Sequence, residues 1–232
     1  MIFEFVNLPE LNFDLKSATT DAGRKYVSPE GNYYSSVTTV LSDYNKKAIM
    51  EWRKRVGDKE ANRISSQASR RGTSLHSVCE KYLLNEMSEM KMKTMMPNIK
   101  ELFFSIKKEL DENIGKIYSL EQALYSDSMK VAGRVDCIAE WNGKLSVIDF
   151  KSSSKIKKKE NIKNYFMQCT AYSLMFQELT GRSIDQIVVV IAVENGEKQI
   201  FIENPNNYLN DWYEMLQNHL NKRELQSDKE SV

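Results

Sequence analysis

The stretch "GRVDCIAEWNGKLSVIDFKSSSK", residues 133–155, determines how the rest of this chain is interpreted. Asn142 and Gly143 form a two-residue loop that favours a β-hairpin, because this kind of turn needs positive φ at both positions. Counting outward from the loop, we predict that Asp136 lies opposite Asp149. The count also makes them a non-hydrogen-bonded pair, with Cα atoms about 4.5 Å apart.

Two carboxylates directly opposite each other destabilise a sheet, so a cation is expected between them. Lys151 shares the face of Asp149, about 6.6 Å further along the strand. The other face is apolar and is predicted to be buried; it carries Val131, Val135, Cys137, Ile148 and Phe150. Arg134 is predicted to face Lys151, so a surface ladder of ion pairs is the alternative to a cation site.

The composition indicates a single intracellular domain. The chain has 232 residues, 41% of them hydrophobic and 28% charged, which is enough to build one large core. No apolar run reaches the ~18 residues that span a bilayer, so no membrane partner is expected. The acidic N-terminal segment does not resemble a signal peptide, and the three cysteines show no metal-ligand or disulfide spacing. We therefore expect an intracellular, reducing location.

Basic residues gather in two places, although the formal net charge is only +1. Residues 46–71 contain nine basic and three acidic side chains, and residues 151–163 contain six lysines and one glutamate. Such patches fit a nucleic-acid backbone, but a charge run is more often a solvated face. The patches alone leave the partner open.

The periodicity predicts an α/β fold in which a central mixed β-sheet is flanked by helices, with an N-terminal helical elaboration. Helices are expected at 44–86, with a break near Gly57, and at 97–113, 159–180 and 205–222. Strands are expected at 116–125, 130–141, 144–151, 185–194 and 198–203. The expected domain covers 1–222, divided at 1–115, 116–203 and 204–222, and a disordered tail is expected over 223–232.

Five further motifs occur in order along the chain: "GNYYSSVTTVLS" (31–42), "RGTSLH" (71–76), Glu121, "GRVD" (133–136) followed after twelve residues by "DFK" (149–151), and "QCTAY" (168–172). Together they resemble the PD-(D/E)xK nuclease superfamily and its RecB-like branch. The first motif is similar to the mitochondrial genome maintenance exonuclease family and its phage relatives, except that Ser35 stands where that family often has proline.

The resemblance implies a restriction-endonuclease-like core and a metal-dependent DNA exonuclease, acting on single-stranded ends in replication, recombination or repair. It implies Mg²⁺ or Mn²⁺ held by His76, Asp136, Asp149 and the backbone carbonyl of Phe150. Lys151 and Glu121 complete the expected catalytic set. Substrate contacts are expected from Gln168, Tyr172, Ser152, Ser153, Arg71 and Lys155.

The same resemblance favours the cytoplasm of a bacterium or of a phage-infected host, with replication or recombination proteins as further partners. An iron–sulfur cluster is not expected, because the branch that binds one needs four cysteines and this chain has three.

Blander interpretations stay open at this point. His76 lies at the edge of an apolar helical stripe, and Gln168 and Tyr172 share a helix face that fits core packing. If these residues serve only packing, two other functions are open. The chain is a catalytically silent nucleic-acid-binding module, or it is an α/β domain with a charged ladder that binds no divalent metal. The complete set of His76, Asp136, Asp149 and Lys151 favours the enzyme.

Overall fold

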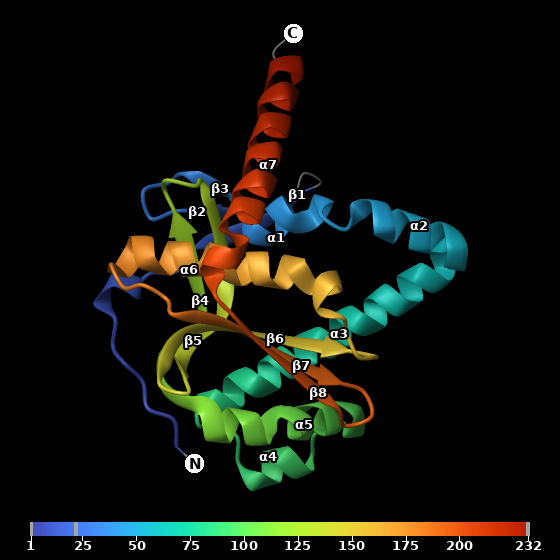
Figure 1. Cartoon of the computed structure of the whole chain (residues 1–232), viewed down its shortest axis with the longest axis vertical. Coiled ribbons are helices and arrows are strands. Elements are labelled where there is room, and N and C mark those ends of the chain that lie inside the picture. The colour runs from blue at the N-terminus through green and yellow to red at the C-terminus, as the bar shows by residue number, and fades with distance from the viewer. Residues whose placement is uncertain (1, 21–22, 231–232) are drawn as a thin grey trace.

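An eight-stranded mixed sheet forms the centre of the molecule (Figure 1). The computed structural model describes residues 2–20 and 23–230, without the side chains of 224–230. The strand order is β1 (Lys16–Thr20), β2 (Gly23–Val27), β3 (Tyr33–Ser36), β5 (Val131–Trp141), β6 (Lys144–Ser153), β7 (Gln186–Val193) and β8 (Lys198–Glu203). β4 (Ile114–Ser126) pairs with β5 along its whole length.

The sheet forks beside β5. β3 runs parallel to the start of β5, at Val131 and Ala132, and β6 runs antiparallel to its end, from Cys137 to Trp141. Because β4 occupies the other edge of β5 throughout, β3 and β6 share a single edge. Within the described part of the chain, residues 133–136 therefore have no strand partner on that edge.

Helices cover both faces of the sheet (Figure 1). The longer helices are α2 (Lys46–Val56), α3 (Asp58–Leu83), α5 (Pro97–Asn113), α6 (Lys163–Thr180) and α7 (Leu209–Glu230). The shorter ones are α1 (Val37–Val40), α4 (Glu89–Lys93) and the 3-10 helices η1 (Pro9–Leu11), η2 (Leu41–Asp43), η3 (Lys159–Ile162) and η4 (Pro205–Tyr208). Over residues 2–20 and 23–230, no helix combines the length and the apolar character needed to cross a bilayer.

Two apolar clusters lie on opposite sides of the sheet. One is built mainly on α6 and α7, with Phe166, Phe176 and Trp212 buried in it. The other is built on α3 and α5, with Leu75 and Phe103 buried in it. Burying large side chains from both layers is the main stabilising contribution, at roughly 25 cal/mol for each Å² of apolar surface. The sheet between them is consequently held rigidly by apolar packing.

The predicted fold class, a mixed sheet flanked by helices, is confirmed. α5 and β8 have the predicted bounds, and Gly181 ends α6 with φ 71°, as predicted for a C-cap. The helix expected from residue 159 instead starts with η3 and becomes α-helical at Lys163. α7 continues past the expected end at 222 to Glu230, through residues with good helix propensity such as Arg, Glu, Leu and Gln. The predicted division into one domain and a tail stays a prediction.

Candidate active site

The β5–β6 hairpin turns at Asn142 (φ 51°) and Gly143 (φ 75°), as the sequence predicts. Its ladder keeps the predicted register only as far as the pair Cys137–Ile148. The expected pairing of Asp136 with Asp149 in that ladder is therefore wrong. The strands part at the fork, and Asp136 Oδ2 instead accepts a hydrogen bond from the backbone N–H of Phe150 at 2.8 Å. The predicted pairing of Arg134 with Lys151 is wrong for the same reason, since the β5–β6 ladder does not extend beyond Cys137 and Ile148.

A local distortion of β4 and β5 explains why the predicted faces were also wrong. Glu121 has φ 48°, a left-handed conformation that is rare for a residue with a side chain, and the ladder omits the pair Glu121–Asp136. The alternation of faces breaks there: Val135 packs in the cluster under α6, whereas Cys137 packs in the cluster under α3. The hairpin thus has no polar face exposed to solvent. Its charged residues lie in a gap inside the sheet.

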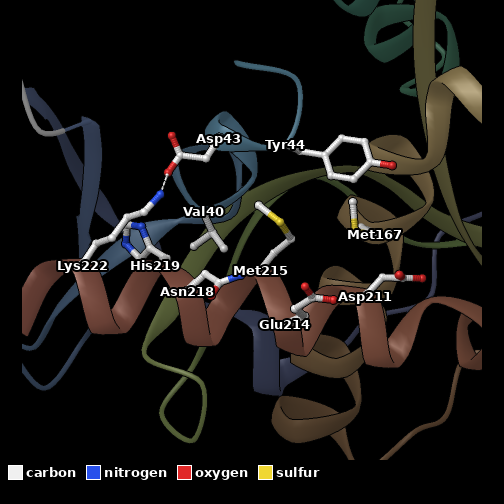
Figure 2. A pocket seen from close by; sticks show the side chains of 10 residues that line it. All are labelled: Val40, Asp43, Tyr44, Met167, Asp211, Glu214, Met215, Asn218, His219 and Lys222. Atoms are coloured by element: carbon white, nitrogen blue, oxygen red, sulfur yellow. Dashed lines mark hydrogen bonds and ion pairs between the residues drawn. The ribbon is translucent and has the colours of Figure 1, made fainter. Parts of the chain in front are cut away.

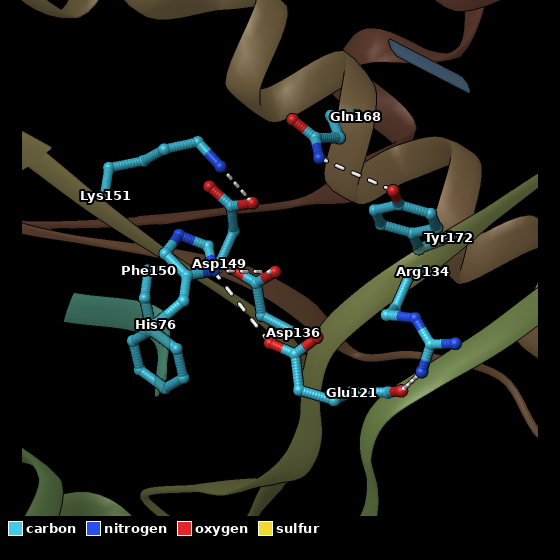
Figure 3. A network of polar contacts seen from close by, with 9 residues as sticks. All are labelled: His76, Glu121, Arg134, Asp136, Asp149, Phe150, Lys151, Gln168 and Tyr172. Atoms are coloured by element: carbon cyan, nitrogen blue, oxygen red, sulfur yellow. Dashed lines mark hydrogen bonds and ion pairs between the residues drawn. The ribbon is translucent and has the colours of Figure 1, made fainter. Parts of the chain in front are cut away.

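Three potential metal ligands meet at this gap (Figure 3). His76 comes from α3, Glu121 from β4 and Asp136 from β5, and one ligand atom from each lies within 4.8 Å of the others. His76 Nδ1 is 3.4 Å from Asp136 Oδ1 and 3.9 Å from Glu121 Oε1. Among the described residues, no other group of three His, Cys, Asp or Glu side chains meets this criterion.

Asp149 and Lys151 form a buried ion pair next to this group, with 2.5 Å between Oδ1 and Nζ. Lys151 Nζ also lies 5.2 Å from the centre of the Tyr165 ring. Asp149 is only 2% exposed, and its second oxygen, Oδ2, has no hydrogen-bond partner among the described residues. A buried carboxylate oxygen without a partner is energetically costly, which suggests that a bound group satisfies it. The role of Asp149 as a metal ligand stays a prediction.

Burial and neighbouring charges shift the titration of these groups. Burial lowers the pKa of His76, but hydrogen bonds to Asp136 and Glu121 outweigh it and raise that pKa to about 10. Burial acts to raise the pKa of Asp136, yet its bond to His76 holds that pKa below the ordinary value. Burial raises the pKa of Asp149 to about 6, against the opposing charge of Lys151. Asp136 and Asp149 therefore share a poorly solvated gap with the basic side chains of His76 and Lys151.

The expected substrate residues on α6 lie on the other side of Asp149 (Figure 3). Gln168 Nε2 donates to the hydroxyl of Tyr172 at 3.5 Å, and Tyr172 is 3% exposed. A Cβ on Gly133 would come within 2.9 Å of the Tyr172 ring, so glycine in the motif allows this contact. Tyr172 therefore packs as a core residue with a polar tip near the site.

The other expected substrate residues differ in whether their side chains are already hydrogen-bonded within the protein or exposed to solvent. Arg71 Nε donates to Ser152 Oγ at 3.3 Å, which joins α3 to β6 beside Lys151. Ser153 is buried, and its hydroxyl donates to the carbonyl of Lys155 at 2.6 Å and accepts the N–H of the same residue. The hydroxyl of Ser153 therefore organises the loop, whereas the side chain of Lys155 is exposed. Their contacts with a substrate stay predictions.

Comparison with known proteins supports the family that the sequence motifs resemble. The sequence profile of the PD-(D/E)XK nuclease superfamily matches residues 45–230, most of the chain. The chain belongs to the PD-(D/E)XK nuclease superfamily.

Among curated proteins, this chain is 46% identical to mouse mitochondrial genome maintenance exonuclease 1 over 44 residues, 19% of the chain and 13% of that protein. It is 27% identical to the human protein of the same name over 135 residues, 54% of the chain and 38% of that protein. The chain thus matches well under half the length of these relatives. A presumed exonuclease of Eubacterium rectale, of known crystal structure, is 13% identical, with TM-score 0.48 over 70% of this chain and 69% of that one.

Two residues beside the candidate site were missed by the sequence analysis. Arg134 was considered only in the alternative ladder of ion pairs, yet its Nη1 donates to the backbone carbonyl of Glu121. Glu194 received no role, yet its Oε1 lies 2.6 Å from Arg71 Nη1. Arg134 stands inside the "GRVD" motif, which is a signal that was available. Glu194 follows β7 and is brought to Arg71 only by the tertiary structure, so no sequence signal points to it.

A separate cavity of about 360 Å³ lies between α1, α6 and α7 (Figure 2). It is bordered by several carboxylates, but Asp43 is paired with Lys222, and Asp211 is paired with Lys163 at 2.7 Å. None of the residues that line it belongs to the group at the sheet fork. The candidate active site is therefore the group at the fork and not this cavity.

Proposed function

We propose that this nuclease is a metal-dependent DNA exonuclease that acts on single-stranded ends in replication, recombination or repair. The observation that carries the proposal is the convergence of His76, Glu121 and Asp136 beside the buried Asp149–Lys151 pair. Structural ion pairs rarely combine an imidazole, three carboxylates and a lysine in one gap of a sheet. The names of the mammalian relatives support the exonuclease part of the proposal.

The donor set fits a divalent cation such as Mg²⁺ or Mn²⁺. Carboxylate oxygens are the preferred ligands of both, and two of the three converging side chains are carboxylates. His76, Glu121 and Asp136 would hold the cation, and the unpaired Oδ2 of Asp149 offers a further oxygen. When bound, the cation would neutralise charge that develops on the phosphate and would lower the pKa of a water molecule.

The chain's own residues have separate tasks in this reaction. The N–H of Phe150 fixes the carboxylate of Asp136, so this ligand is preorganised by the backbone. Asp149 holds the ammonium group of Lys151, which can then orient the attacking water and donate a hydrogen bond to the phosphate oxygen. Because Asp149 is buried and Lys151 is only partly exposed, the interaction of Lys151 with the phosphate is less screened by solvent than at the open surface.

Exposed cations support a DNA backbone as the substrate. Lys54, Arg55, Lys59 and Arg70 are exposed on α2 and the first half of α3, the helix that leads to His76. Cations in such a row bind phosphates without reading sequence, and the binding weakens as salt increases. Arg53 is less free, because it is paired with Asp58 at 2.7 Å.

The test is cleavage of end-labelled single- and double-stranded oligonucleotides with Mg²⁺, with Mn²⁺ and with a chelator. We expect metal-dependent shortening of single strands, and about 10²–10³-fold slower cleavage by Lys151→Ala, because it removes one preorganised donor. Lys144→Ala is the matched control, since Lys144 lies on the same strand but is exposed at the hairpin turn. Circular dichroism checks that each variant is folded.

The opposite result would identify a different function. A folded wild-type protein that binds DNA, but cleaves it with neither metal, would be a catalytically silent binding module. A protein that neither cleaves nor binds DNA would reduce the group at the fork to a structural network.

A further inference from the structure

Of the three potential metal ligands that meet at the fork, only Glu121 has a strained backbone. Its φ of 48° lies in the left-handed region, which a residue with a side chain adopts at an energetic cost and keeps only where the surroundings hold it there. Its neighbours on both sides pair normally with β5, Leu120 with Cys137 and Gln122 with Val135. The distortion is thus confined to one residue, and it is the residue whose carboxylate reaches His76.

Glu121 has no partner in the ladder with β5, and Arg134 donates a hydrogen bond to its backbone carbonyl. Arg134 pairs with Ala123, and its guanidinium reaches back along β4 so that Nη1 donates to the Glu121 carbonyl (Figure 3). Arg134 Nη2 also lies 3.6 Å from Asp14 Oδ1. The guanidinium is therefore held between the N-terminal segment and the distorted strand.

We propose that Arg134 is a positioning residue, which locks Glu121 in the left-handed conformation so that its carboxylate joins His76 and Asp136 at the metal site. This inference rests on the proposed function, since it needs the three side chains to bind a divalent cation. The role differs from that of a catalytic residue, because Arg134 acts only through the backbone of Glu121.

A direct contact with DNA is the competing role, because the side chain of Arg134 is 45% exposed. The two roles make opposite predictions for metal binding without DNA. A phosphate contact leaves the affinity for Mn²⁺ unchanged and weakens binding of DNA. A positioning residue weakens the binding of Mn²⁺ and leaves the KM for DNA unchanged once Mn²⁺ is saturating.

The experiment is titration of Mn²⁺ into the DNA-free protein, followed by calorimetry and by the electron paramagnetic resonance signal of free Mn²⁺. Wild type, Arg134→Gln, Glu121→Gln and the double variant form a thermodynamic cycle. We expect Arg134→Gln to weaken Mn²⁺ binding about tenfold, the low end of effects seen for groups that orient metal ligands. In the Glu121→Gln background the same substitution should have no further effect.

Two outcomes would overturn the inference while leaving the proposed function intact: wild-type Mn²⁺ affinity in Arg134→Gln, or an equal loss in the presence and absence of the Glu121 carboxylate. Absence of Mn²⁺ binding by the wild type would overturn the proposed function as well, so the two failures are distinguishable. Arg134→Met keeps the aliphatic stem without a donor, and it replaces Arg134→Gln if that variant does not fold. Arg182→Gln, an exposed arginine after α6, is the control and should bind Mn²⁺ like the wild type.

Discussion

The two halves of helix α3 show how differently one continuous helix can be constrained. α3 has 26 residues, and its second half packs on the sheet through Leu75, Cys79 and Leu83, all fully buried. Residues 62–70 of the first half are exposed at every position. α2, which precedes it, has no buried residue at all among those described. We call α2 and residues 58–70 the arm; it projects to one side of the molecule (Figure 1).

The comparison shows which residues core packing explains and which it does not. His76 lies in the packed half, so its position is determined by the same contacts that hold α3 on the sheet. Ala61 is the one buried residue among the described residues of the arm, so the arm gains little stability from burial. Its helices depend more on local contacts such as that of Arg53 with Asp58 and Asn62. Packing does not account for its many cations, which the proposed function assigns to contact with DNA.

The largest expected difference between the halves is in core stability. Leu75→Ala should lower the free energy of unfolding by about 2–5 kcal/mol, because it leaves a cavity in a fully packed cluster. Ile64→Ala, in the arm, should lower it by no more than about 0.5 kcal/mol, because Ile64 is 36% exposed. Urea unfolding followed by circular dichroism measures both. A cost for Ile64→Ala similar to that of Leu75→Ala would mean that the arm packs against something in solution.

Substitution of two glycines near the site tests the same difference between tightly and loosely packed parts of the molecule. Gly133→Ala should destabilise the protein by about 1–3 kcal/mol, because its Cβ would lie 2.9 Å from the Tyr172 ring in the packed sheet. Gly72→Ala, where the arm meets the packed half, should stabilise it by up to about 1 kcal/mol. The new Cβ has 3.9 Å of space to Ser152 Oγ, and alanine favours a helix more than glycine does.

Thermal unfolding of the two glycine variants provides the measurement. Equal destabilisation by both would show that α3 is packed as tightly at Gly72 as β5 is at Gly133, and the boundary between the halves would have to move towards the N-terminus.

The smallest expected effect concerns Glu178, which is exposed yet tied to the packed part of the molecule. Its carboxylate accepts hydrogen bonds from the hydroxyls of Ser126 and Ser128 and from the N–H of Asp127, between 2.6 and 2.8 Å. Burial acts to raise the pKa of Glu178, but these bonds outweigh it and lower that pKa. The charged form is therefore favoured by folding, so its stabilisation is present above the unfolded pKa of about 4.3 and is lost as pH falls through the lowered value.

Glu178→Gln should cost about 1 kcal/mol or less at pH 7, since solvent screens an exposed side chain. The difference from the wild type should narrow below about pH 4.3, which urea unfolding at a series of pH values can follow. A difference that stays constant down to pH 3 would show that the charge of Glu178 does not contribute.

Local signals were sufficient for much of the fold. The bounds of α5, the turn at Asn142 and Gly143, and the end of α6 at Gly181 follow from residues within a few positions of each feature. The motif spacing likewise pointed to the right family and to His76, Glu121 and Asp136, which the structure brings together. Short-range propensities and motif spacing act along the chain, so they can be read from it.

Only the tertiary structure decided how the site is built. The fork beside β5 depends on β3, which lies about a hundred residues earlier in the chain, and it separates Asp136 from the expected pairing with Asp149. The left-handed Glu121 depends on Arg134 and on the missing rung between β4 and β5. The prediction that alternate residues share one face assumes a regular ladder. A distortion at one residue therefore places the following side chains on the opposite face of the sheet, and the amino-acid composition gives no sign of it. The sequence by itself therefore singled out three side chains that lie close together, His76, Glu121 and Asp136, and the packing of distant strands determined which of their atoms meet.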